Sequence, residues 1–189
     1  MINSDYYVLN SGRISPYDED LKKYSADLNW DWRLLAALVC QESNFRPTVK
    51  SYAGAYGLMQ VTSATVQRFG MDTVISATQN LRIGVMMLKW LDKKIAQNIE
   101  DPSERVKFVM AAYNIGIGHI IDAQLLARKY GRNMNKWDDV KEFLLNKSQP
   151  KYYNDPLVKF GYCSGIQTVN YVSEVIDRFK HYKNITSKL

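Results

Sequence analysis

Residues 34–45 read LLAALVCQESNF, an apolar run that ends on a carboxylate. Its large apolar side chains recur at three- and four-residue spacing, which predicts a helix with a buried stripe. Glu42 follows Leu38 by four residues and therefore lies on or beside that stripe. A carboxylate there is partly desolvated, which disfavours its charged form and raises its pKa. Such a glutamate can donate a proton near neutral pH; the alternative is a solvated glutamate at a helix end.

The length and composition are those of an ordinary globular protein. The chain has 189 residues, of which 46% are hydrophobic and 23% are charged. This length suits one domain with a sizeable core, or a small domain with extensions. No apolar run approaches the ~20 residues of a membrane span. Residues 1–10 lack a basic stretch followed by an apolar core, so we expect no signal peptide, and the sequence is either cytosolic or a mature or trimmed fragment.

The formal net charge of +6 would suit an anionic partner such as nucleic acid or an acidic wall polymer. The basic residues are scattered, however, and no nucleic-acid-binding motif is present. Nucleic acid is therefore the weaker alternative, and we do not expect it as a partner.

The cysteines and histidines do not indicate a metal site. Cys40 and Cys163 are far apart in sequence, and two lone cysteines form no metal site. A disulfide between them stays open, although a cysteine in an apolar helix is typically a small buried residue. His119 and His181 lack metal-ligand spacing, so we expect no metal and no cofactor. We expect His119 to cap a helix and His181 to lie in an exposed basic tail.

Helical patterns cover most of the chain, and strand signals are few. The expected helices lie at about residues 16–28, 31–44, 62–69, 80–99, 102–114, 120–130, 137–145 and 167–182. Residues 149–165 read as irregular, and any sheet would be a short hairpin in the loop after Glu42. The predicted fold class is therefore mostly α.

Three segments have compositions that helix packing does not require. The first contains Glu42, and the second is GAYGLMQ at residues 54–60, where two glycines flank a tyrosine. Gln60 can donate and accept hydrogen bonds in fixed geometry, which suits the hydroxyls and acetamides of a sugar. The third is AYN at residues 112–114, which places a phenol and an amide at a helix end. Taken singly, the last two could be a glycine-rich turn and an ordinary capped helix end.

Together these segments resemble the soluble lytic transglycosylase family, within the goose-type lysozyme superfamily. The order and spacing of Glu42-Ser43, Ser51, residues 54–60 and residues 112–114 carry the resemblance. It covers about residues 15–183, and it implies a lysozyme-like helical fold. We expect residues 1–14 to be a linker or arm, residues 15–183 to be the catalytic domain, and residues 184–189 to be a tail.

Residues 12–18, 148–153 and 161–165 are similar to one branch of the family, that of membrane-bound lytic murein transglycosylase F. Members of this branch carry an N-terminal regulatory domain that resembles solute-binding proteins. The resemblance implies that the chain is a catalytic-domain fragment, with residues 1–10 as the remains of a linker. It also implies a periplasmic or cell-envelope location, with outer-membrane association of the full-length protein.

The resemblance implies an activity on peptidoglycan glycan strands. The family cleaves the β-1,4 bond between N-acetylmuramic acid and N-acetylglucosamine without adding water, and the product carries a 1,6-anhydro ring. Glu42 resembles the single catalytic acid, which then acts as the base on the C6 hydroxyl. The substrate-binding positions implied by the match are Ser51, Gly57, Gln60, Tyr113, Asn114 and Tyr171. One departure is Val61-Thr62-Ser63, where many relatives have a Met-Pro pair, so Thr62 stands in for a cleft methionine.

The distribution of acidic residues agrees with a site that has one carboxylate. Most glycosidases need two carboxylates that flank the scissile bond, but no Asp or Glu occurs from Ser43 through Met71. A site with one carboxylate must recruit its second group from the substrate, as an N-acetyl oxygen can provide. A distant residue such as Asp155 stays open as a second acid. The alternatives are a hydrolytic muramidase or chitinase of the same fold, and a catalytically silent glycan-binding module.

Overall fold

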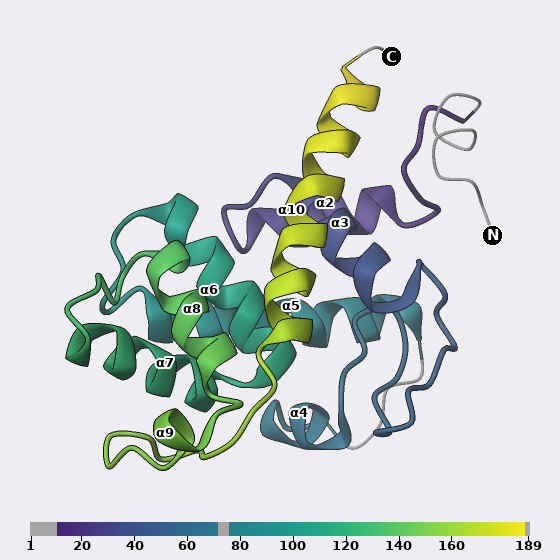
Figure 1. Cartoon of the computed structure of the whole chain (residues 1–189). Coiled ribbons are helices and arrows are strands. Elements are labelled where there is room, and N and C mark those ends of the chain that lie inside the picture. The colour runs from purple at the N-terminus through teal and green to yellow at the C-terminus, as the bar shows by residue number, and fades with distance from the viewer. Residues whose placement is uncertain (1–10, 72–75, 188–189) are drawn as a thin grey trace. The chain divides into compact units, whose positions relative to one another are not determined.

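The structure is a computed structural model that describes residues 11–71 and 76–187. These residues are mostly helical, as predicted (Figure 1). The helices are α2 (Asp18–Ala26), α3 (Trp32–Ser43), α4 (Ser63–Arg68), α5 (Ala77–Ile95), α6 (Pro102–Ile115), α7 (Ile117–Lys129), α8 (Trp137–Asn146), α9 (Pro150–Tyr153) and α10 (Ile166–Thr186). Most of the expected arm, at residues 1–10, lies outside the described residues.

The chain divides into two compact units. The first unit contains residues 1–89 and 174–189, and the second contains residues 90–173. The boundaries fall within α5 and α10. The expected domain limits at residues 15 and 183 stay predictions, although α10 itself continues to Thr186 and so enters the segment expected to be a tail.

Helix α3 forms the core of the first unit. All seven residues from Leu34 to Cys40 are buried, so the helix is enclosed on every side and not only along a stripe. Helix α2 packs against it. The other fully buried side chains of this unit include Leu21, Leu58, Met59, Leu81 and Leu88. A Cβ at position 84 of α5 would lie 2.6 Å from the Cβ of Met59, so this position is occupied by a glycine.

Both ends of α3 are fixed by specific residues. Asp31 caps the N-terminus, and its carboxylate accepts a hydrogen bond from the backbone N–H of Arg33 at 3.0 Å. The Arg33 guanidinium also pairs with Asp31 at 2.6 Å. At the other end Asn44 has a φ of 51° and Phe45 a φ of 57°, and these left-handed conformations stop the helix.

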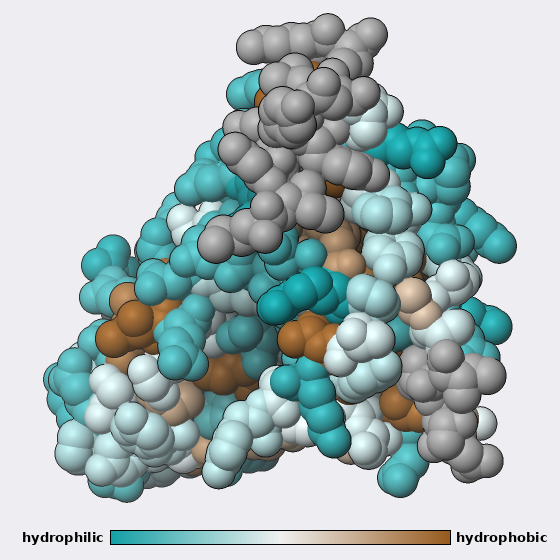
Figure 2. Space-filling model, turned by 90° about the vertical axis from the view of Figure 1, so that its right-hand side faces the viewer, coloured by the Kyte–Doolittle hydropathy of each residue, from teal (hydrophilic) through white to brown (hydrophobic). Residues whose placement is uncertain are grey.

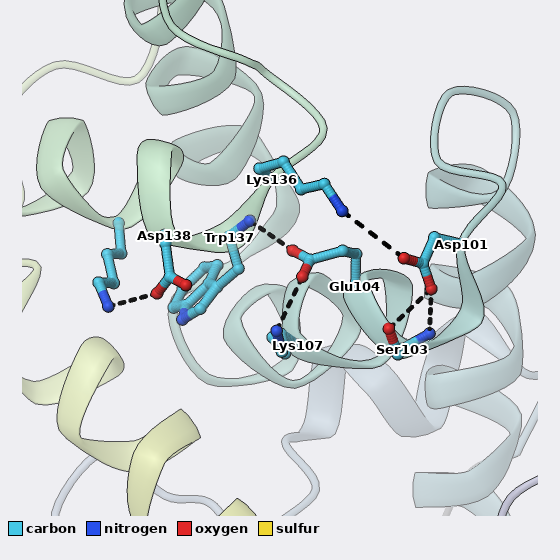
Figure 3. A network of polar contacts seen from close by, with 8 residues as sticks. Asp101, Ser103, Glu104, Lys107, Lys136, Trp137 and Asp138 are labelled. Carbon is cyan, nitrogen blue, oxygen red and sulfur yellow. Dashed lines mark hydrogen bonds and ion pairs between the residues drawn. The ribbon is translucent and has the colours of Figure 1, made fainter.

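The second unit is built on α6, α7 and α8, which pack on one another. Glu104 of α6 is buried, and its carboxylate accepts hydrogen bonds from the Trp137 N–H at 2.6 Å and from Lys107 at 2.8 Å (Figure 3). Trp137 opens α8 and packs edge-on against Phe108, with 5.5 Å between ring centroids. Glu104 of α6 therefore accepts a hydrogen bond from a backbone N–H at the N-terminus of α8, where the N–H groups have no partner within their own helix.

The predictions for the segments around α7 and α9 differ from the structure. Residues 149–165 are not wholly irregular, because α9 occupies Pro150–Tyr153 with a proline at its first position. Helix α7 starts at Ile117, since Gly116 alone, with a φ of 94°, separates it from α6. His119 consequently lies inside α7 and does not cap a helix.

In the part of the chain that the structure describes, the extended structure consists of isolated bridges. Isolated bridges pair Lys50 with Tyr56 and Tyr56 with Val61, which agrees with the prediction of at most a short hairpin. Among residues 11–71 and 76–187, no helix is both long enough and apolar enough for a bilayer crossing. Figure 2 shows a face on which hydrophobic residues form only small areas between hydrophilic ones.

Asp31→Ala is predicted to lower the free energy of unfolding by about 1 kcal/mol, because α3 loses its cap. The Arg33 guanidinium holds the pKa of Asp31 below its ordinary value. This contribution is present above the ordinary aspartate pKa and is lost as the pH falls through the lowered pKa. Asp31→Asn keeps a capping oxygen and should lose only the charge-dependent part, as measured by urea unfolding at neutral and acid pH. Equal losses in both variants would contradict the capping role.

Candidate functional site

Glu42 is the penultimate residue of α3 and is half-buried. Its neighbour Ser43 is buried, and the Ser43 hydroxyl lies 2.9 Å from the carbonyl oxygen of Leu58 and 3.2 Å from that of Val39. The end of α3 is thereby joined to the glycine-rich segment at residues 54–60. The backbone that carries the Glu42 carboxylate is fixed on one side by the core and on the other by this loop.

Two residues of α10 hold the residue before Glu42. The Gln41 side-chain amide donates to Glu174 at 2.6 Å and accepts from Arg178 at 3.2 Å. Arg178 also lies 3.3 Å from the Cys40 sulfur. Neither Glu174 nor Arg178 was expected from the sequence. In the sequence these two residues form an oppositely charged pair at i,i+4 spacing. Such pairs are too common on helices to indicate a functional site.

The loop after α3 uses two of the predicted site residues for its own structure. The Ser51 hydroxyl accepts a hydrogen bond from the Ala55 N–H at 3.0 Å. The Gln60 amide nitrogen donates to the carbonyl oxygens of Val49 at 3.1 Å and Gly57 at 2.9 Å. Since both amide hydrogens of Gln60 are engaged, its carbonyl oxygen is the atom that can serve a substrate hydroxyl.

Gly57 has a structural reason to be glycine. It is buried with a φ of 80°, and a Cβ there would lie 2.3 Å from the side-chain nitrogen of Asn80. Asn80 is 1% exposed; it donates to the Tyr56 carbonyl oxygen at 2.8 Å and accepts from the Met59 N–H at 2.8 Å. Asn80 was not expected as a supporting residue, because an asparagine near the start of a helix resembles a cap.

Thr62 replaces the expected methionine with a different contact. Its hydroxyl caps α4 and accepts from the Thr65 N–H at 3.3 Å.

The other predicted site residues lie in the second unit. Tyr113 and Asn114 are near the end of α6, where Gly116 turns the chain. The Asn114 amide oxygen accepts a hydrogen bond from the Thr168 hydroxyl at 2.7 Å, and Thr168 is 1% exposed. Tyr171 follows Thr168 by three residues on α10, so the two share a helix face, and Tyr171 is also buried. The structure thus brings Asn114 to the helix segment that carries Tyr171.

Thr168 fixes which way the Asn114 amide is turned. Because the oxygen is held by a buried hydroxyl, the amide nitrogen is the group that Asn114 can present to a ligand. Its N–H groups would donate to a carbonyl or hydroxyl oxygen.

Two buried acidic residues of the second unit, Asp155 and Asp122, have structural partners. Asp155 is buried, pairs with Lys129 and accepts the Leu157 N–H at 3.0 Å, and the Lys129 hydrogen bond holds the pKa of Asp155 below its ordinary value. Asp122 pairs with Lys147 at 2.6 Å, and both side chains are almost fully buried. These carboxylates neutralise cations and order loops.

No metal site is evident in the part of the chain that the structure describes, since it contains no group of three or more His, Cys, Asp or Glu suited to holding an ion. Cys40 and Cys163 are both free thiols and both buried, and burial raises the pKa of the Cys163 thiol.

The sequence around the predicted site residues identifies the family. The Transglycosylase SLT domain family matches residues 20–136, which include Glu42, the 54–60 segment and Asn114. The chain belongs to this family.

Relatives of the SLT domain family extend the match toward the C-terminus. Membrane-bound lytic murein transglycosylase F of Pseudomonas fluorescens strain Pf0-1 is 37% identical over 163 residues, 86% of this chain and 33% of that protein. The protein with the same name from Desulfosudis oleivorans is 37% identical over 147 residues, 78% of this chain and 32% of its own length. The chain therefore spans about a third of the length of these curated relatives.

Solved structures support the fold. The 70 kDa soluble lytic transglycosylase SLT70 of Escherichia coli has a TM-score of 0.59 and 24% identity, over 89% of this chain and 24% of that chain. Lytic transglycosylase Slt of Pseudomonas aeruginosa has a TM-score of 0.59 and 20% identity, over 90% of this chain and 25% of that chain. The lysozyme-like helical fold expected from the sequence is confirmed.

Gly57→Ala is predicted to destabilise the protein strongly, because it strains a left-handed residue and displaces Asn80. Gly54→Ala is the matched control: its φ of 82° is nearly the same, but no atom lies within 4 Å of an added Cβ. Each change carries the left-handed penalty of about 1–2 kcal/mol, and Gly57→Ala adds about 1–3 kcal/mol for the broken Asn80 hydrogen bonds. Thermal and urea unfolding measure the difference, and equal effects would refute the Asn80 contact.

Thr168→Val is predicted to lower the free energy of unfolding by about 0.5–1.5 kcal/mol, because the hydrogen bond from the Thr168 hydroxyl to Asn114 is lost. Thr168→Ser restores the hydroxyl and should recover the stability. The measurement is urea unfolding of the parent and of both variants. A valine variant with the parental stability would show that Asn114 does not need this partner.

Proposed function

We propose that this chain is a peptidoglycan lytic transglycosylase domain with Glu42 as its single catalytic acid. It would cleave the β-1,4 bond between N-acetylmuramic acid and N-acetylglucosamine and leave a 1,6-anhydromuramic acid end. The observation that carries the proposal is a half-buried glutamate at the end of an enclosed helix, within the segment that matches the SLT domain. Family membership supplies the substrate class, and the geometry supports the acid.

In the first step the Glu42 carboxyl gives its proton to the glycosidic oxygen, and the bond from that oxygen to C1 of the muramic residue breaks. The position of Glu42 in the last turn of α3 disfavours a negative charge, because the unpaired carbonyl groups there carry partial negative charge. The substrate's N-acetyl oxygen supports the developing positive charge at C1.

In the second step the Glu42 carboxylate takes the proton of the C6 hydroxyl, and O6 bonds to C1. This closes the 1,6-anhydro ring and returns Glu42 to its protonated form, so no water is consumed. Ser51, Gly57 and Gln60 are proposed to bind the sugars. Tyr113, Asn114 and Tyr171 are proposed as further sugar-binding residues. The Asn114 amide nitrogen, turned outward by Thr168, suits an acetamide or hydroxyl oxygen.

The partners of two buried acids of the second unit favour this reaction over hydrolysis with two carboxylates. Asp155, the acid that the sequence left open, pairs with Lys129, and the buried Glu104 is held by Lys107 and the Trp137 N–H. A carboxylate that neutralises a lysine and accepts backbone N–H groups is poorly placed to activate water. Hydrolysis by a muramidase or chitinase remains the second candidate.

We also propose that the protein acts in the cell envelope, where its glycan-strand partner is found. Its relatives are named membrane-bound, and two thirds of their length lies outside the part that this chain matches. The regulatory solute-binding-like domain expected from the resemblance would belong to that remaining length.

Glu42→Gln is predicted to keep the fold and to lower turnover of murein sacculi by roughly 10²–10⁴-fold, because the proton donor is lost. Glu100→Gln, at an exposed position, serves as the control and should cleave at the parental rate. The products of the parent should carry anhydro ends by mass spectrometry. A glutamine variant that lyses sacculi as fast as the parent would exclude Glu42 as the acid, and a parent that releases nothing would indicate a silent binding module.

A further inference from the structure

Phe160 is an exposed ring on a fixed backbone. It lies in the segment between α9 and α10, and 56% of its surface is exposed. The backbone N–H groups of Lys159 and Phe160 each donate to the Asp122 carboxylate at 2.9 Å. Because Asp122 is 1% exposed on α7, this anchor reaches from the core of the second unit to its surface.

The anchor includes a buried ion pair. Lys147, which is 0% exposed, donates to Asp122 at 2.6 Å and lies 3.1 Å from the His119 ring. Burying two charges costs several kcal/mol per ion, so such a pair contributes little net stability but fixes geometry. Here the geometry it fixes is that of a surface segment whose exposed side chain is an aromatic ring.

The ring itself rests on a glycine. A Cβ at Gly118 would lie 2.5 Å from two atoms of the Phe160 ring, so the ring covers the first turn of α7 at contact distance. The His119 ring lies beside it, with 6.0 Å between centroids. Phe160 is therefore supported underneath and at the side, while more than half of its surface faces solvent.

This ring lies near the predicted substrate contacts of the same unit. Gly118 follows Asn114 by four residues, so their Cα atoms are at most about 14 Å apart. A glycan strand is a row of linked sugar rings. A strand bound at Asn114 can thus place a neighbouring sugar over the ring that covers Gly118.

We propose that Phe160 is a stacking platform for a sugar ring of the glycan strand, a further subsite that extends the one at Asn114. The proposal rests on the proposed function for the class of its ligand. Sugar rings present flat arrays of C–H groups that pack on an aromatic face, and ligand sites commonly combine aromatic walls with a few polar groups. A rigid support lowers the entropy cost of binding, which explains the buried anchor.

The test measures binding of a pentasaccharide of N-acetylglucosamine by calorimetry, in a Glu42→Gln background to prevent cleavage. Phe160→Ala and Phe160→Leu should both raise the Kd roughly tenfold, or about 1.4 kcal/mol, while Phe160→Tyr and Phe160→Trp should keep it near the parental value. Leucine keeps the apolar surface but lacks the flat face, so it separates stacking from general hydrophobic contact. A leucine variant that binds like the parent would overturn the proposal.

Gly118→Ala tests the support without removing the ring. Alanine suits a helix better than glycine, so the fold should persist while the added methyl group displaces Phe160, and the Kd should again rise several-fold. Ile121→Ala, an exposed apolar position on the same helix, is the control and should bind like the parent. A Gly118→Ala variant with parental affinity would contradict a fixed platform.

Two further results separate the possible explanations. Binding of the parent, but not of Phe160→Ala, to vesicles of anionic phospholipid, with unchanged pentasaccharide affinity, would assign the ring to a membrane surface and overturn the glycan platform. If the parent releases anhydro products while every Phe160 variant binds the pentasaccharide equally, the platform fails and the proposed function stands. If affinity depends on the ring but no anhydro product forms, the platform stands and the proposed reaction fails.

Discussion

The arrangement of the first unit depends on the burial of residues 34–40 of α3 on every side. An unbroken apolar run from Leu34 to Cys40 can be enclosed on every side only if its polar neighbours are placed at the helix ends. Asp31 satisfies the N-terminus, and the chain leaves the other end through two left-handed residues, Asn44 and Phe45, immediately after Ser43. A half-buried carboxylate at that end is thus a consequence of how the core helix must stop.

The loop after α3 has backbone N–H and C=O groups that need hydrogen-bond partners. Its polar groups must be satisfied without regular strands, and the structure satisfies them with side chains: Asn80 serves Tyr56 and Met59, while Gln60 serves Val49 and Gly57. The second unit uses the same principle. Thr168 orients Asn114, and Asp122 holds the backbone beneath Phe160. Gln60 belongs to the loop that it supports, whereas Asn80, Thr168 and Asp122 each reach a short segment from a distant part of the sequence.

The sequence predicted what depends on local pattern. The helical class, the central helix, the partial burial of Glu42 and the family followed from periodicity, composition and motif order. The supporting residues could not be predicted, because Asn80, Glu174, Arg178 and Thr168 reach their partners from far along the chain and have no periodic signal. The short helix α9 and the position of His119 inside α7 were missed for a related reason. Prolines and glycines near an element boundary mark a break without fixing which residue begins the next helix.

The central claim is that the substrate's own C6 hydroxyl, and not water, attacks C1 after Glu42 has protonated the leaving oxygen. The most direct measurement is digestion of murein sacculi in water enriched in heavy oxygen, followed by mass spectrometry of the released fragments. The account predicts anhydromuramic ends that contain no heavy oxygen. Reducing muramic ends that carry the heavy isotope would show that water is the nucleophile and would contradict it.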